Sequence, residues 1–131
     1  MIHWRVDFEI GEEVIDSQHR GLVDLINELE ASLESSEKVI DINSVVERLI
    51  EYTHFHFTYE EEHMEKNHYD HLEAHKAQHK ILIRQIIMLN SDIKNHNQNI
   101  INSIESILRK WLLDHILEQD KSYGSFLSGK Q

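Results

Sequence analysis

The histidines are the residues of this sequence best able to do chemistry, and there are 11 of them in 131 residues. This is several times an ordinary usage of roughly 2 %. They are scattered along the chain, which argues against a tag or a surface tract. Seven histidine and carboxylate side chains stand on otherwise apolar helical stripes and are the candidate metal ligands: His19, His56, Glu60, His75, His79, His115 and Asp120.

The spacing of these candidates determines which of them can share an ion. Glu60 follows His56 by four residues, and His79 follows His75 by four. Residues four apart lie on the same face of a helix, so each pair can bind one ion or two adjacent ions. Asp120 follows His115 by five residues, a rotation of ~140° on regular geometry. We therefore expect Asp120 to reach the site only as a bridge from the side or through a distorted helix end.

The remaining histidines leave one alternative open. His71 and His75 are also four apart, so they could form the ligand pair of this segment in place of His75 and His79. We prefer His79 because its stripe continues into apolar residues. His54 is predicted to point away from the inner stripe, and no role is assigned to His63 or His68. Solvent exposure is predicted for His3, His96, Glu61 and Glu62.

Amphipathic helices are the elements that position these ligands. Apolar residues recur at three- and four-residue steps, and the chain has no proline and only four glycines, as long helices favour. Asp16 or Ser17 is the expected N-cap of the first helix. The predicted fold is all-α, an antiparallel up-down-up-down four-helix bundle with an N-terminal arm, in one domain over 1–131. The arm covers 1–16, and the helices cover 17–36, 42–67, 70–93 and 98–124.

The order of the helices brings the candidate ligands to one level of this bundle. In an alternating bundle the start of the first and third helices and the end of the second and fourth lie at the same end. His19 is near a start, Glu60 is in the last half of its helix, His75 is in a first turn, and His115 is near an end. Buried polar side chains that converge without partners are costly, so a buried metal site is the preferred interpretation.

The types of ligand favour two irons. Five imidazoles and two carboxylates are too many for one tetrahedral zinc and too rich in nitrogen for calcium or magnesium. The chain has no cysteine for a thiolate site. Five histidine bonds, four from two bridging carboxylates and two from a bridging oxide or hydroxide make about eleven, whereas two six-coordinate ions need about twelve. One position would stay open for a small ligand.

The ligand-bearing segments resemble those of a known family, the hemerythrins, in particular the single-domain bacterial ones. The segments are Asp16-Ser-Gln-His19, His56-Phe-x-x-Glu60-Glu61, His75-x-x-x-His79 and Trp111-Leu-x-x-His115-x-x-x-x-Asp120. The resemblance implies that His75, His79 and His115 hold one iron and that His19 and His56 hold the other. It also implies that Glu60 and Asp120 bridge the two irons. It also implies that O2 binds reversibly at the second iron.

The pocket for O2 would be lined near the fourth-helix histidine. Leu112 and Ile116 flank His115 within one turn and are the expected lining, with Trp111 and Leu117 as neighbours. For each of these residues, packing in the apolar core is an equally good explanation as lining an O2 pocket. A small, dry pocket is what the protein would contribute to reversible binding.

Three functions are compatible with such a site. Reversible O2 binding for storage, transport or delivery is favoured over an enzyme, because no inward tyrosine, cysteine or extra carboxylate is evident as a relay. The alternatives are a di-iron enzyme handling peroxide or nitric oxide, and a sensor acting through a partner protein. The net charge of −11 argues against nucleic acid, and no apolar run approaches the ~20 residues of a membrane span. A cytoplasmic protein, plausibly monomeric, is expected.

Overall fold

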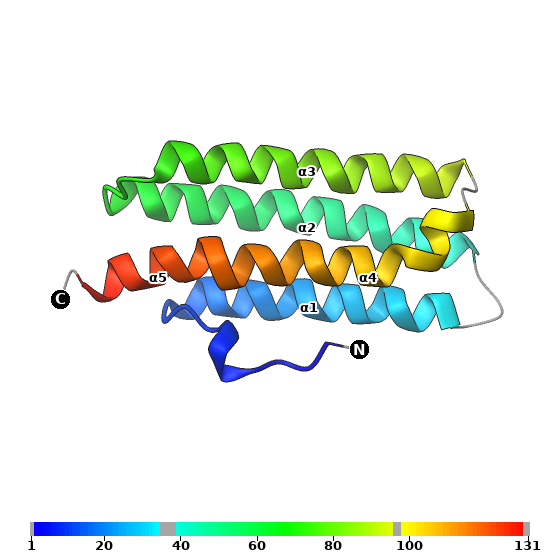
Figure 1. Cartoon of the computed structure of the whole chain (residues 1–131), viewed down its shortest axis with the longest axis horizontal. Helices are drawn as coiled ribbons and strands as arrows, with labels where there is room; N and C mark the ends of the chain where they lie inside the picture. Colours follow the sequence, from blue (N-terminus) through cyan, green and yellow to red (C-terminus); the bar gives the residue numbers. More distant parts are fainter. Residues whose placement is uncertain (1, 35–38, 96–97, 130–131) are drawn as a thin grey trace.

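The structure is a computed structural model that describes residues 2–34, 39–95 and 98–129. The described residues form an N-terminal arm, helices and connecting turns, and they contain no strand. A short 3-10 turn, η1 (Val6–Phe8), precedes α1 (Glu13–Glu34), α2 (Val39–Lys66) and α3 (Leu72–Lys94). The last rod consists of α4 (Gln98–Asp114), the π-helical segment η2 (His115–Asp120) and α5 (Lys121–Ser128), which run on as one continuous helix (Figure 1).

Four antiparallel rods make up the molecule, and the predicted bundle is confirmed. Helix α1 packs on α2, α2 on α3, α3 on α4, and α4 back on α1, so the four rods enclose one interior. The α2–α3 turn, the start of α1 and the last rod's α5 lie toward the same end of the bundle (Figure 1). No helix in the described ranges is long and apolar enough to cross a membrane.

The first helix starts earlier than predicted, and the predicted N-cap is wrong. Helix α1 begins at Glu13, and the Glu12 carboxylate accepts the backbone N–H of Ile15 at 2.7 Å, which satisfies one of the free donors of the first turn. Asp16 lies inside the helix and turns back instead. Its carboxylate accepts the backbone N–H groups of Ile10 at 2.8 Å and Gly11 at 3.2 Å, so it fixes the arm and not the helix start.

The arm, residues 2–12, is tied to the bundle by specific contacts. Asn27 accepts the backbone N–H of Ile2 and donates to its carbonyl, both at 2.8 Å. Gly11 adopts φ +94°, a left-handed conformation that glycine tolerates best. Gly124 of α5 approaches so closely that a Cβ there would collide with the carbonyl of Ile10. These contacts hold the arm against α1 and α5.

The other predicted helix bounds need small corrections. Helix α2 starts at Val39 instead of 42, α3 runs over Leu72–Lys94 instead of 70–93, and the last rod continues to Ser128 instead of ending at 124. The extension is stabilised because the aromatic rings of Tyr123 and Phe126 pack onto Tyr69 in the α2–α3 turn. The predicted break after Ser35 and the connection around His96 lie partly outside the described residues.

Two apolar clusters fill the interior, and a polar layer separates them. The larger cluster occupies the middle and far part of the bundle, with Leu22, Phe57 and Ile116 on its near side. The smaller cluster lies by the α2–α3 turn and contains Ile10, Ile15, Met64, Tyr69 and Tyr123. The layer between them consists of buried histidines and carboxylates. The fold therefore places the candidate ligands away from solvent on both sides.

Candidate metal centre

All seven candidate ligands meet in this one layer. Each is buried, with six of them between 0 % and 2 % exposed and only His115 reaching 6 %. Their ligand atoms form two groups within which all atoms lie within 4.8 Å of one another. The first group contains His75, His79 and His115, and the second contains His19 and His56. Both carboxylates, Glu60 and Asp120, belong to both groups.

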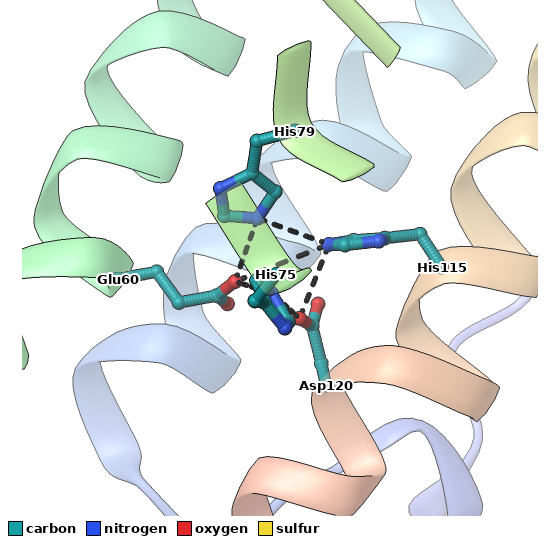
Figure 2. Close-up of side chains that lie close together, drawn as sticks. All are labelled: Glu60, His75, His79, His115 and Asp120. Carbon is teal, nitrogen blue, oxygen red and sulfur yellow. Dashed lines mark hydrogen bonds and ion pairs between the residues drawn. The ribbon is translucent and has the colours of Figure 1, made fainter. Parts of the chain in front are cut away.

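The first group points inward from three rods (Figure 2). The Oε1 atom of Glu60 lies 2.8 Å from Nε2 of His75 and 3.0 Å from Nε2 of His79. The Oδ1 atom of Asp120 lies 3.1 Å from Nε2 of both His75 and His115. Three imidazole Nε2 atoms and one oxygen of each carboxylate thus surround a common point.

The second group uses the other oxygen of each carboxylate. The Oε2 atom of Glu60 lies 3.4 Å from Nε2 of His56 and 3.7 Å from Nε2 of His19. The Oδ2 atom of Asp120 lies 2.9 Å from Nε2 of His19. Each carboxylate therefore presents one oxygen to each group, which is the geometry of two bridging ligands between adjacent ions.

The π-helical segment η2 explains how Asp120 reaches the layer. A π-turn bonds residue i to i+5, so residues five apart return to the same face. The segment runs over His115–Asp120, and its two end residues both point inward. The expected distortion of the helix end is therefore present at the position where the ligand spacing changes from four to five.

Two neighbouring side chains fix the orientation of two imidazoles. Nδ1–H of His56 donates to Oε1 of the buried Gln18 at 2.7 Å, and Nδ1–H of His79 donates to Oε2 of Glu61 at 2.7 Å. Each bond leaves Nε2 to face the layer, as partners of metal-bound histidines do. The prediction that Glu61 faces water is wrong, since it reaches His79 from a partly buried position. Glu61 stands next to Glu60 in the sequence, and nothing in that position indicated that it would accept a hydrogen bond from His79.

The other histidines lie outside the layer. His71 is exposed at the N-cap of α3 and belongs to neither group of ligand atoms, so the structure favours the register with His75 and His79. His54 and His3 are exposed, as predicted, and His68 is exposed in the α2–α3 turn. The prediction for His96 lies outside the described residues.

The unsatisfied polar atoms of the layer test whether metal ions suit it. Within the described residues, Nε2 of His56, Oε2 of Glu60 and both carboxylate oxygens of Asp120 are buried without hydrogen-bond partners. The same holds for both ring nitrogens of His19, whose short distance to Asp120 lacks hydrogen-bond geometry. Such atoms are costly in a protein interior. Cations between them would satisfy these atoms together, so the residues fit a pair of metal ions.

Opposing effects set the charges of the imidazoles. Burial lowers the pKa of His56 to about 3, so it is a neutral ligand at pH 7. Burial acts the same way on His19, His75 and His115, but their close approach to the negative carboxylates of Asp120 and Glu60 outweighs it. These interactions raise the pKa to about 9 for His19 and His75 and about 10 for His115. Without metal, protonated imidazoles would balance the two buried carboxylates.

Metal binding is therefore expected to release protons. At pH 7 the three histidines with raised pKa values are protonated in the metal-free protein, and each must lose its proton to bind an ion. We expect roughly three protons released per chain and an affinity for ferrous iron that increases as the pH rises from 7 toward 9. Calorimetric titration in buffers of different ionisation enthalpy measures this number. A metal-binding enthalpy independent of the buffer would contradict the expectation.

A narrow apolar void lies beside the second group. It is too narrow to admit a water molecule, and it touches the imidazoles of His19, His56 and His115. The remaining lining residues are Leu22, Phe57, Leu82, Trp111 and Leu112. Leu112 thus lines this void, whereas Ile116 is fully buried but is not among the lining residues, and Leu117 is 40 % exposed.

An inward tyrosine is present, contrary to the sequence-based expectation. Tyr123 of α5 is fully buried, and its hydroxyl lies 2.6 Å from Nδ1 of His63 on α2. Burial raises the pKa of Tyr123 to about 12, so its hydroxyl carries a proton at pH 7. The argument against a redox or proton relay that rested on the lack of such a residue is therefore wrong.

The fold and the layer together define a class: a four-helix bundle whose interior holds a histidine- and carboxylate-rich metal centre. The model of the hemerythrin HHE cation-binding domain matches residues 11–127. The chain therefore belongs to the hemerythrin family, whose members are di-iron oxygen-binding proteins.

Individual relatives agree with this assignment over most of their length. A bacteriohemerythrin of Pseudomonas aeruginosa is 32 % identical over 120 residues, covering 92 % of this chain and 77 % of the relative. A bacteriohemerythrin of Clostridium acetobutylicum is 30 % identical over 127 residues, covering 94 % and 98 %. A crystal structure of wild-type hemerythrin superposes with a TM-score of 0.82 at 28 % identity, covering 95 % and 96 % of the two chains.

Proposed function

We propose that this protein binds O2 reversibly at a di-iron centre and serves in oxygen storage, transport or delivery. The observation that carries the proposal is the way Glu60 and Asp120 each present one oxygen to each of two buried groups of imidazoles. The proposal includes a cytoplasmic location and a carrier role instead of catalytic turnover. O2 is the proposed small-molecule partner.

The seven ligands divide the work of holding two ions. His75, His79 and His115 would hold one iron, His19 and His56 the other, and Glu60 and Asp120 would bridge them. The iron pair, when bound, supplies the two electrons that reversible O2 binding uses. The group with two histidines has fewer ligands, so it is the one that retains an open position. Gln18 and Glu61 hold His56 and His79 with Nε2 directed at the layer.

The void on the side of the second group has the character that a reversible O2 site needs. Its lining beyond the imidazoles is apolar, which disfavours water and anions that would compete for the open position. The one polar group of Trp111 is committed elsewhere, because its Nε1–H donates to the carbonyl of Leu82 at 3.1 Å. Leu112 contacts this space from α4. These residues support binding of a small neutral molecule.

A reversible spectrum tests the proposal. The protein is loaded anaerobically with ferrous iron, its iron content is measured, and it is then exposed to O2. We expect about two irons per chain and an oxygen-to-iron charge-transfer band that appears with O2 and disappears under vacuum. Rapid conversion to a stable diferric form without a reversible stage would overturn the carrier and favour an enzyme. A chain that binds no iron would overturn the di-iron centre itself.

Leu112→Ala is expected to shorten the lifetime of the O2-bound state. Removing the side chain opens the void toward water, and water promotes loss of the bound ligand. We expect about tenfold faster decay of the charge-transfer band, equivalent to ~1.4 kcal/mol. Leu113→Ala is the matched control, because Leu113 is half-buried on the same helix and does not line the void. Equal decay in both variants would remove the assigned role of Leu112.

A second candidate function is peroxide or nitric oxide handling by the same centre. The buried Tyr123, paired with His63, is the observation that favours it, because a carrier has no need of a buried tyrosine with a titratable partner. Turnover measurements with hydrogen peroxide and a one-electron donor distinguish the two functions. Sustained turnover would favour the enzyme, and a single slow oxidation would favour the carrier.

A further inference from the structure

The buried Tyr123 and the partly buried His63 form a hydrogen-bonded pair that the oxygen site does not use. The Tyr123 side chain is fully buried, and the 2.6 Å distance between its hydroxyl and Nδ1 of His63 is short for a hydrogen bond. Since the hydroxyl is protonated at pH 7, it donates and Nδ1 accepts. The proton of a neutral His63 is then on Nε2.

The pair lies directly next to the metal layer. His63 follows Glu60 by three residues on α2, and Tyr123 follows Asp120 by three on α5. Three residues are one helical turn, a rise of ~4.5 Å along each rod. The pair thus connects the same two rods as the two shared carboxylates, one turn closer to the α2–α3 end. The ring of Tyr69 packs edge-on against Tyr123 at 4.8 Å and closes it off.

The partner of the hydroxyl is a base whose charge can be stabilised. A buried hydroxyl needs only some acceptor, and a backbone carbonyl would satisfy it. Here the acceptor is an imidazole, and its Nε2 lies 3.9 Å from Oε1 of Glu12 at the start of α1. The side chains of His63 and Glu12 are 22 % and 20 % exposed, so the pair joins the buried tyrosine to the surface. Asn67 donates to the backbone carbonyl of His63 at 2.9 Å, and its Nδ2 lies 3.4 Å from Nδ1 of the imidazole.

From this geometry we propose that Tyr123 and His63 form a site of proton-coupled one-electron oxidation. Tyr123 gives one electron to a one-electron oxidant, which is reduced by that electron. At the same time its O–H bond breaks and an N–H bond forms at Nδ1 of His63, so the products are a neutral tyrosyl radical and an imidazolium. Moving the proton to an adjacent base avoids a bare positive charge on the buried ring. The imidazolium is attracted by the Glu12 carboxylate.

The position of the pair beside the metal layer suggests that it supplies an electron to that layer. Where a reaction with peroxide oxidises the metal layer by one electron, Tyr123 can supply the missing electron, so that no ligand is oxidised. This role rests on the proposed di-iron function. The oxidation of Tyr123 itself does not, because the tyrosine, the base and the carboxylate all belong to the chain.

The experiment uses a variant in which Tyr123 is the only tyrosine, with the other three tyrosines of the chain replaced: Tyr52→Phe, Tyr59→Phe and Tyr69→Phe. A flash-generated trivalent ruthenium polypyridyl complex serves as the one-electron oxidant. Radical formation is followed by transient absorption and electron paramagnetic resonance, in iron-loaded and in metal-free protein whose helicity is checked by circular dichroism. We expect a neutral tyrosyl radical that forms more slowly in D2O than in H2O.

His63→Gln in this background tests the role of the base. Glutamine can accept the hydroxyl hydrogen bond but cannot take up the proton, so we expect radical formation to slow on the order of 10²-fold. His54→Gln, an exposed histidine on the same helix, is the matched control and is expected to leave the rate unchanged. An unchanged rate in His63→Gln, or no isotope effect in the parent, would overturn the proposal. Because the metal-free arm needs no iron, failure of the di-iron function would be seen separately as loss of the O2 spectrum.

Discussion

Glu60→Gln is expected to lower the iron content from about two ions per chain to below about 0.2, the largest loss from any single substitution in the layer. Glu60 has one oxygen toward each group of imidazoles, at 2.8 Å from His75 and 3.4 Å from His56. Glutamine would replace one oxygen by an amide nitrogen, which carries no lone pair for a metal, and would remove a buried negative charge. One ion loses its Glu60 ligand atom, the bridge between the two groups is broken, and both ions lose the attraction of the buried negative charge.

The measurement is metal analysis after anaerobic loading with ferrous iron, together with the O2 spectrum. Glu62→Gln is the matched control, because Glu62 is exposed two residues further along α2 and the change removes the same charge. We expect this control to keep its full iron content. Retention of one iron in Glu60→Gln would show that one group holds its ion without a bridge through Glu60, and retention of two would remove Glu60 from the ligand set.

The fold and the convergence of the ligands could be predicted because both follow from helical periodicity. A stripe that repeats every three or four residues identifies the inner face of each helix. The alternation of four such helices then fixes the level at which His19, Glu60, His75 and His115 meet. These arguments use only rise and rotation per residue, so they do not depend on details of packing.

The start of α1 could not be predicted in the same way. Asp16 is an acidic residue just before a regular apolar stripe, which is the typical signal of an N-cap. Its carboxylate instead accepts two N–H groups of the preceding arm, and Glu12 caps the helix. Which backbone donors a short acidic side chain reaches depends on the path of the arm, and that path is set by contacts far along the chain, such as Gly124 on Ile10.

Tyr123 was missed because the helix changes its phase before it. On regular geometry Tyr123, eight residues after His115, is rotated by ~80° from the inner stripe. The π-helical segment η2 absorbs one extra residue, so the effective rotation is ~20° and the ring points inward. The five-residue spacing of His115 and Asp120 already implied such a distortion. If the extra residue is taken into account for the positions after Asp120, Tyr123 falls on the inner stripe, so the buried tyrosine could have been predicted.

His79→Gln is expected to lower iron content and thermal stability together, which separates a metal ligand from a packed core histidine. His79 is 2 % exposed, lies 3.0 Å from Glu60 and 2.7 Å from Glu61, and stacks on the ring of Phe57 at 3.7 Å. Losing these contacts destabilises the protein with or without metal. Losing the ligand additionally removes the stabilisation that bound metal gives to the folded state.

The decisive quantity is therefore the difference in Tm between iron-loaded and chelated protein. Metal present at a thousand times its Kd stabilises by ~4 kcal/mol, which corresponds to about 10–20 °C for a domain of this size. We expect the unsubstituted protein to show this difference, and His79→Gln to lose most of it while its iron content falls to about one ion per chain or less. His71→Gln, at the exposed start of the same helix, is expected to keep both quantities. If His79→Gln lowered the Tm of both forms equally and retained its iron, His79 would be a packing residue, because only a ligand couples the metal to the stability of the fold.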